Sequence, residues 1–102
     1  MRTTLPEQTV IQPQTAAVTS PPFPTASNDT ITVSADHLAT TETVTLQFLA
    51  NGVAKQVTDL TGTAVNLTAS ISGVVLEGGP SYVFVKSVTA SACGVYVSPK
   101  IL

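Results

Sequence analysis

The chain contains 102 residues, only 10% of them charged, and has a formal net charge of -2 at pH 7. This length suits one domain, and the charged fraction lies far below the quarter or so that is typical of soluble domains. The four basic residues are scattered, so the chain has no basic patch that could follow a phosphate backbone, and nucleic-acid binding is disfavoured.

Membrane insertion and export are disfavoured by the distribution of apolar residues. No stretch approaches the length of a membrane-spanning helix, and polar residues and Pro6 interrupt the apolar run that a secretory signal needs. We therefore expect synthesis in the cytoplasm and no membrane partner. Cys93 is the only cysteine, which agrees with a reducing compartment and leaves the domain without an internal disulfide.

Proline and glycine divide the chain near Asn28. Five of the seven prolines lie at or before Pro24, whereas all six glycines lie at or after Gly52. We therefore predict an extended, proline-rich N-terminal arm over residues 1–28 and a compact β domain over residues 29–102. A core this small contributes only about 3–5 kcal/mol on its own, so self-association or docking on a larger partner is expected.

The predicted arm carries spaced apolar side chains that are its candidate partner-binding residues: Leu5, Val10, Ile11, Val18 and Phe23. Each of them is suited to a shallow pocket on a partner, while the backbone of residues 9–12 (TVIQ) is suited to pairing with the edge of a neighbouring sheet. Prolines lower the conformational entropy that such an arm loses when it docks.

The clearest strand prediction is a hairpin centred on Asn51-Gly52. Residues 30–34 (TITVS) alternate apolar and polar side chains, and residues 42–50 (ETVTLQFLA) do so over a longer run. An Asn-Gly pair between alternating runs predicts a two-residue turn in which both residues have positive φ. The turn fixes the facing pairs as Ala50 with Val53, Phe48 with Lys55, Leu46 with Val57, and Val44 with Asp59.

Residues 64–71 alternate again, and four of their side chains are predicted to face inward: Val65, Leu67, Ala69 and Ile71. Residues 74–77 form a short strand, and residues 94–98 form the last one.

The strand predicted at residues 81–88 carries apolar side chains on both faces. Tyr82, Phe84 and Val88 should share one face, with Val83 and Val85 on the other. Two apolar faces indicate a central strand, or a strand whose outer face meets a partner.

Short strands separated by turn residues predict an all-β fold. Their spacing favours a small antiparallel β-sandwich or barrel. The immunoglobulin-like arrangement is one candidate, although the chain has no tryptophan and cannot form the usual disulfide between the sheets.

The sequence offers little catalytic chemistry. His37 is the only histidine and adjoins Asp36, but neighbouring residues on a strand face opposite sides, so we expect a solvated loop residue and no acid–base pair. Cys93 is expected to be a small, buried and inert side chain. We therefore predict no catalytic residues, no metal site and no cofactor, and a non-enzymatic role.

Tyr82 and Tyr96 are the tyrosines available to stack on a sugar ring. Both lie inside predicted strands, where an aromatic side chain more often serves packing.

Residues 40–98 resemble small all-β proteins of tailed bacteriophages. The resemblance is carried by ETVTLQFLANG and by LTASISGVVLEGGPSYVFVKSVTASACGVYV, with its glycine pair, aromatic-rich strand and Gly-Val-x-Val ending. Many such proteins have no assigned role; those that do are often virion components, including head decoration (cement) proteins. The resemblance implies a structural role in a virion, supplies no functional residues, and does not include the arm.

These expectations combine into one functional hypothesis. The β domain of a capsid decoration protein would sit on the major capsid protein or another virion subunit, while the arm crosses subunit boundaries and ties them together. Two alternatives stay open: a receptor- or glycan-binding module of a tail fibre or baseplate, and a tail-tube or connector subunit that forms rings.

Overall fold

A computed structural model describes residues 8–99 of the chain, and no helix occurs among them. The strands are β1 (Gln8–Gln14), β2 (Val18–Thr19), β3 (Thr30–Ala35), β4 (Val44–Ala50), β5 (Val53–Gln56), β6 (Asn66–Leu67), β7 (Gly73–Glu77), β8 (Tyr82–Lys86) and β9 (Cys93–Pro99). The predicted all-β class is therefore confirmed.

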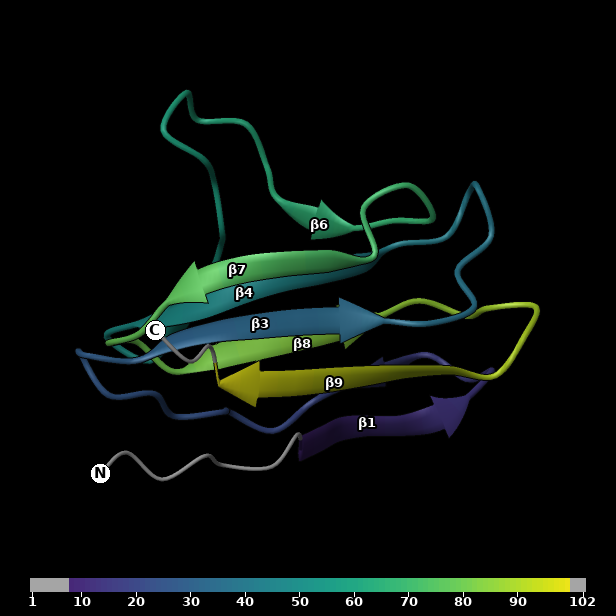
Figure 1. Cartoon of the computed structure of the whole chain (residues 1–102), viewed down its shortest axis with the longest axis horizontal. Coiled ribbons are helices and arrows are strands. Elements are labelled where there is room, and N and C mark those ends of the chain that lie inside the picture. Colours follow the sequence, from purple (N-terminus) through teal and green to yellow (C-terminus); the bar gives the residue numbers. More distant parts are fainter. Residues whose placement is uncertain (1–7, 100–102) are drawn as a thin grey trace.

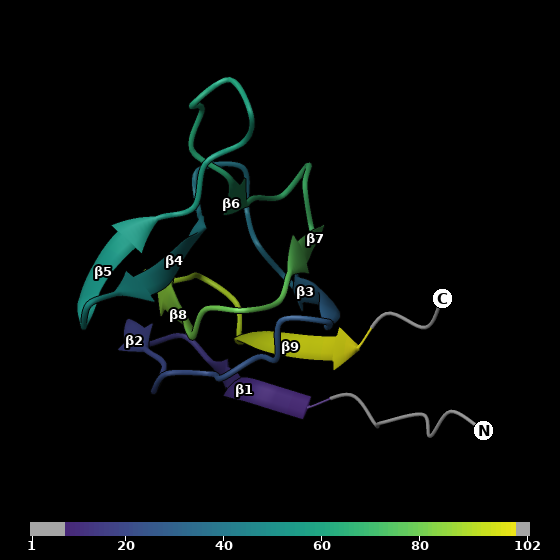
Figure 2. The ribbon, with the colours of Figure 1, turned by 90° about the vertical axis from the view of Figure 1, so that its left-hand side faces the viewer.

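The strands form two antiparallel sheets that face one another as a small β-sandwich (Figures 1 and 2). One sheet has the order β1-β9-β3-β7, and the other has the order β2-β8-β4-β5, with β6 also paired to β4. In Figure 2 the β5, β4, β8 and β2 strands lie on the left, and the β7 and β3 strands lie on the right.

The strand order is that of a jelly roll. Apart from the β4–β5 hairpin and the short β6, each connection along the chain crosses from one sheet to the other. In an immunoglobulin-like sandwich the last two strands are neighbours in one sheet. Here β8 and β9 lie in opposite sheets, so the immunoglobulin-like candidate is wrong.

The core forms because alternating strands turn one apolar face toward the space between the sheets. In β3 the side chains of Ile31, Val33 and Ala35 are buried, whereas the intervening ones are half-exposed. The strand β8 is central, between β2 and β4, as its two apolar faces predicted. The fully buried apolar side chains include Phe84, Ile11, Leu46, Leu67, Val33, Val44, Val95 and Val97.

The β4–β5 hairpin has the predicted turn and register. Asn51 and Gly52 both have positive φ, at 52° and 77°. Ala50 pairs with Val53, and Phe48 pairs with Lys55.

One predicted pair of this hairpin is wrong. Val44 faces Leu67 of β6, and Asp59 does not lie opposite it. After β5, the Val57 N–H still donates to the Leu46 carbonyl of β4. The chain then forms a projecting loop over residues 57–65 and pairs with β4 again as β6.

Two side chains predicted to face inward, and one predicted to share a face with Tyr82 and Phe84, are exposed. Ala69 and Ile71 follow β6 in a turn where the Thr68 N–H donates to the Ile71 carbonyl, so the alternation of residues 64–71 does not continue as a strand. Val88 lies beyond the end of β8 and is 69% exposed. Alternation predicts a face only while the residues stay in one strand.

Part of the predicted arm, residues 1–28, pairs with strands of the predicted domain, residues 29–102. Within the described residues, β1 is a strand of one sheet and β2 is a strand of the other. The reason is physical: proline is tolerated on an edge strand, where its missing N–H faces away from the ladder, so a proline-rich segment can still join a sheet.

Candidate functional site

The N-terminal segment, residues 8–29, closes one long side of the sandwich. Its first part, β1, pairs with β9 at the edge of its sheet, with Ile11 opposite Val95. The register shifts on both sides of Ile11, which leaves room for Pro13 in the edge strand.

The crossover from β1 to β2 is held by Lys86 and Thr89. The Lys86 ammonium, on a side chain only 1% exposed, donates to the Ala16 carbonyl at 2.6 Å and to the Ser87 carbonyl at 3.1 Å. The Thr89 N–H donates to the Thr15 carbonyl at 2.9 Å. One carbonyl oxygen of the crossover and one that directly follows β8 thus take the place of water around the buried Lys86 amino group.

After the crossover the segment runs along the edge of β8 that does not pair with β4. The Ser20 N–H donates to the Phe84 carbonyl at 2.9 Å, and the Phe84 N–H donates to the Ser20 hydroxyl at 3.0 Å. Phe23 and Tyr82 exchange two backbone hydrogen bonds, of 2.8 and 2.9 Å. Pro21 and Pro22 lie between these contacts, so the pairing is intermittent and not a continuous strand.

The segment ends in a turn packed against the β7–β8 connection. The Asp29 carboxylate accepts the Ala26 N–H at 2.8 Å, and the Gly78 N–H donates to the Asp29 carbonyl at 2.8 Å. A Cβ on Gly78 would lie 2.0 Å from the Ala26 carbonyl oxygen, so only glycine allows this approach.

These contacts decide where the predicted partner-binding residues lie. Ile11 is 2% exposed inside the core, and Val10, Val18 and Phe23 are partly buried against it. Leu5 lies outside the described residues. In this fold the described members of the set contact their own chain, and Ile11 has no surface to offer a partner.

A small cleft remains beside Phe23. It has a volume of about 130 Å³ and is lined in part by Phe23, Pro24, Ile31 and Val97. Sites for drug-sized ligands begin near 300 Å³, so this cleft accommodates only a few atoms.

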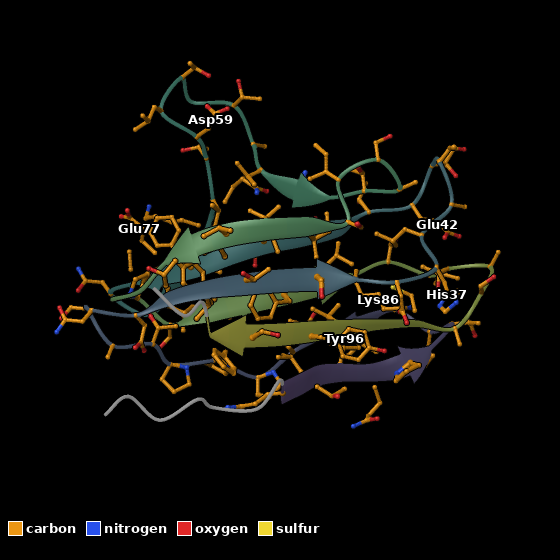
Figure 3. All side chains as sticks on the ribbon, viewed as in Figure 1. His37, Glu42, Asp59, Glu77, Lys86 and Tyr96 are labelled. Atoms are coloured by element: carbon orange, nitrogen blue, oxygen red, sulfur yellow. The ribbon has the colours of Figure 1, made fainter. Side chains whose placement is uncertain are left out.

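Asp36 and His37 directly follow β3 and form a polar cluster with Tyr96. Figure 3 labels His37 and Tyr96. The Asp36 carboxylate accepts the Gly94 N–H at 2.8 Å and the Tyr96 hydroxyl at 3.2 Å, and the His37 Nδ1 lies 3.3 Å from it. Burial tends to raise the pKa of Asp36, but these hydrogen bonds and the neighbouring His37 outweigh it and hold that pKa below its ordinary value.

The expectation that Asp36 and His37 would point apart is wrong. His37 has a φ of 58°, outside a strand conformation, so its ring turns back toward the preceding carboxylate. The expectation of a solvated loop residue fits, since the His37 side chain is 65% exposed. No group of three His, Cys, Asp or Glu side chains within residues 8–99 is placed to hold a metal ion.

Cys93, Tyr82 and Tyr96 were predicted to pack within strands, and all three do so. Cys93 is fully buried, and burial raises the pKa of its thiol. Tyr82 is buried and donates its hydroxyl to the Glu77 carbonyl. Tyr96 is half-buried and its ring lies over Gly94, where a Cβ would meet the tyrosine hydroxyl at 2.5 Å.

The loop of residues 57–65 was not among the residues predicted to bind a partner. It stands above the rest of the molecule in Figure 1. Leu60 at its tip has a relative exposure of 107%, the largest value among the exposed large apolar residues of the described chain. The signal that could have found it is Asp59, two residues before Thr61 and three before Gly62, in a pattern typical of a tight turn.

This loop is held by hydrogen bonds within itself. The Asp59 carboxylate accepts the Thr61 N–H at 2.9 Å, the Thr61 hydroxyl at 2.7 Å and the Thr63 N–H at 3.1 Å. The Asp59 N–H donates to the Thr63 carbonyl at 2.9 Å. The Thr61 hydroxyl and the Thr63 and Thr61 N–H groups hold the pKa of Asp59 below its ordinary value.

No family model, curated protein or solved structure matches the chain. No helix within residues 8–99 is long and apolar enough to cross a membrane.

Proposed function

We propose that this chain is a non-enzymatic structural protein of a bacteriophage virion, a capsid decoration (cement) protein that binds the major capsid protein or another virion subunit. The proposal starts from the resemblance of residues 40–98 to small all-β phage proteins. Jelly-roll sandwiches are frequent among viral capsid domains, which is an argument by analogy of fold.

The observation that carries the proposal is the loop of residues 57–65. A leucine held fully exposed on a hydrogen-bonded turn gains by burial in a partner and loses little conformational entropy when it docks. Burying one leucine side chain contributes about 1.5–3 kcal/mol, which is weak for a single copy. Copies that also contact one another on a closed shell combine such weak contacts.

The mechanism therefore differs from an arm that ties subunits together along its whole length. Residues 8–29 are held by their own sandwich. The contact with the shell is assigned to the Leu60 loop, and residues 1–7 are the part of the predicted arm left to reach a neighbour.

Copy number tests the proposal directly. The native particle is purified, and this chain is quantified against the major shell protein by mass spectrometry. A ratio that matches icosahedral positions supports a decoration role. A handful of copies per particle would move the protein to the tail or a vertex, and absence from the particle would refute the structural role.

A point variant tests the loop. Leu60→Ser should weaken binding to purified shells by about tenfold or more, because an exposed apolar anchor is lost. Val88→Ser is the matched control, since Val88 is also apolar and 69% exposed but lies elsewhere on the surface. Equal weakening by both variants would argue against a specific anchor at Leu60.

A receptor- or glycan-binding module of a tail fibre or baseplate is the second candidate. It is favoured by the jelly-roll strand order, which lectin domains also use. A glycan array tests it, and specific sugar binding that Leu60→Ser leaves unchanged would favour it over decoration. Ring formation by the purified protein, seen by negative-stain microscopy, would instead favour a tail-tube or connector subunit.

A further inference from the structure

The free edge of β7 is the least protected sheet edge in the described part of the chain. The other long edge strand of the same sheet, β1, contains Pro13 and register shifts. Strand β2 has only two residues, and β5 carries Lys55. Strand β7 has five residues, an unbroken register with β3 and no proline, and native edges of this kind are usually blocked or occupied.

The backbone groups that β7 offers follow from its ladder with β3. The Gly78 N–H donates to the Asp29 carbonyl at 2.8 Å, and the Ala35 N–H donates to the Ser72 carbonyl at 3.0 Å. Hydrogen-bonded pairs alternate along an antiparallel ladder, so within β7 only every second residue bonds to β3.

Applied to the printed register, this alternation makes Val33–Val74 and Ile31–Leu76 the hydrogen-bonded pairs. The N–H and C=O groups of Gly73, Val75 and Glu77 therefore point away from β3. The Glu77 carbonyl already accepts the Tyr82 hydroxyl, whereas Val75 presents both of its groups and a side chain that is 52% exposed.

A cavity lies between the loop of residues 57–65 and the segment that leads into β7. Its volume is about 310 Å³, and Ala64, Val65 and Ile71 supply its apolar lining. A strand added to the edge of β7 would direct alternate side chains toward the inner side of the sheet, where this cavity lies.

The edge also defines the side chains of the strand that fits it. The residue opposite Val75 should be β-branched or apolar, and the residue opposite Glu77 should be basic. The residue opposite Gly73 can be bulky, because glycine has no side chain there. In the added strand, the residue that precedes the one opposite Gly73 would point to the inner side of the sheet, so an apolar side chain there would face the cavity.

The first six residues of the chain, MRTTLP, have this pattern. In the antiparallel register that places Thr4 opposite Val75, Arg2 lies opposite Glu77. Pro6 lies opposite Gly73 and ends the added strand there, because it has no N–H to donate to the Gly73 carbonyl. Leu5 then takes the apolar position that faces the cavity, near Ile71. We propose that residues 1–6 of a second copy add a strand to the free edge of β7.

The same chain cannot supply this strand. Pro6 and Gln8 are two residues apart, so they can be separated by at most about 7 Å. The strands β9 and β3 lie between β1 and β7, which separates β1 from β7 by three strand spacings, about 14 Å. The donor is therefore a second copy. Because each copy gives one strand and receives one, two copies can exchange strands reciprocally in a dimer, or further copies can add head to tail.

Sedimentation equilibrium of the full chain over a range of concentrations tests the proposal. The wild type should associate, and Val75→Pro should weaken the association constant by about tenfold or more, because it removes an outward N–H and leaves the β3 ladder intact. Leu5→Ser should do the same. A wild type that stays monomeric at every concentration overturns the proposal.

The matched control is Ala54→Pro on β5. Val57 donates to Leu46 in the β4–β5 ladder, so by the same alternation the N–H of Ala54 points away from β4. Ala54→Pro should leave association unchanged. If Val75→Pro associates like the wild type, β7 is not the edge that accepts the strand. If Leu5→Ser associates like the wild type, residues 1–6 are not the strand that is donated.

A charge reversal gives a readout that does not depend on proline being tolerated. Glu77→Arg should weaken association by about two- to fivefold, and the double variant Arg2→Glu with Glu77→Arg should restore it. Failure of the double variant to recover overturns the register. The contact is between copies in solution, so its failure leaves the proposed virion role standing, and shell-bound copy number does not bear on it.

Discussion

The two long sides of this sandwich are built in opposite ways. On one side, residues 8–29 pass from β1 to β2 and cover the edges of β9 and β8 with backbone hydrogen bonds. On the other side, β5 and β7 keep free edges, and Leu60, Ile71 and Val75 stay exposed. Figure 2 shows β5 and β7 at these ends of the two sheets.

The difference indicates a division of labour. The proline-rich segment, which looks from its composition like a binding arm, stabilises the fold, because its apolar side chains complete the core. The glycine-containing side, which looks from its alternation like ordinary strands, presents the apolar groups that a partner could bury. Experiments that disturb one side at a time can break or sharpen this contrast.

Deletion of residues 1–28 should have the largest effect. It removes β1, β2 and the buried Ile11, and it uncovers the edges of β9 and β8. We expect the truncated chain to lose cooperative unfolding and dispersed amide resonances, measured by circular dichroism and NMR. Deletion of residues 1–7 is the control and should leave the fold intact; a folded, cooperative chain starting at residue 29 would restore the arm-and-domain division.

Ile11→Ala should have the next largest effect. Removing buried methyl groups costs about 2–5 kcal/mol at such sites, measured as the free energy of unfolding in urea. Ile71→Ala is the same change on the open side, where Ile71 is 52% exposed, and should cost less than about 0.5 kcal/mol. Equal costs at the two positions would contradict the contrast between the sides.

Lys86→Met should have a smaller effect. It removes the donor to the Ala16 and Ser87 carbonyls, and losing hydrogen bonds made by a charged group costs about 1.5–3 kcal/mol. Amide hydrogen exchange should also quicken in residues 14–19 more than elsewhere, because the crossover loses its anchor. Uniform quickening over the whole chain would show that Lys86 supports the core in general.

The smallest effect is expected from pH. The Glu42 carboxylate accepts the Ala39 N–H at 2.8 Å and the Ala90 N–H at 2.7 Å, and these backbone hydrogen bonds hold the pKa of Glu42 below its ordinary value. A lowered pKa stabilises the fold above the unfolded pKa, near 4, and the stabilisation is lost as the pH falls through the folded value. Glu42→Gln should therefore be less stable than the wild type at neutral pH, with a difference that shrinks in acid.

Unfolding free energies of the two proteins measured from neutral pH downward check this. A difference that stays constant with pH would contradict the role of the ionised carboxylate, because only a titrating group makes stability depend on pH.

Several features could be predicted from sequence because they depend on neighbouring residues. Asn51-Gly52 requires positive φ at both positions and so set the hairpin and its nearest pairs. Alternation identified β3, β4 and β8 and the burial of Val33, Leu46 and Phe84. Cys93 was expected to be buried and is.

The candidate site could be predicted only in part. The composition drew attention to residues 1–28 but assigned Ile11 to a partner, whereas it lies in the core of its own chain. The exposed tip at Leu60 was missed, because the pattern around Asp59 and Gly62 indicates a turn without indicating whether the Leu60 side chain is buried. The proximity of His37 to Asp36 depended on a left-handed backbone that the pattern does not reveal.

The sequence by itself determined the all-β class, the central hairpin and most strand positions, since turn chemistry and period-2 alternation act over a few residues. Only the tertiary structure decided which strands are neighbours: that β9 lies between β1 and β3, that β6 takes the place beside Val44, and that residues 8–29 close one side. These pairings join residues far apart in the chain. Their free energies depend on how both faces of each strand are covered once the whole core has formed, which no local pattern encodes.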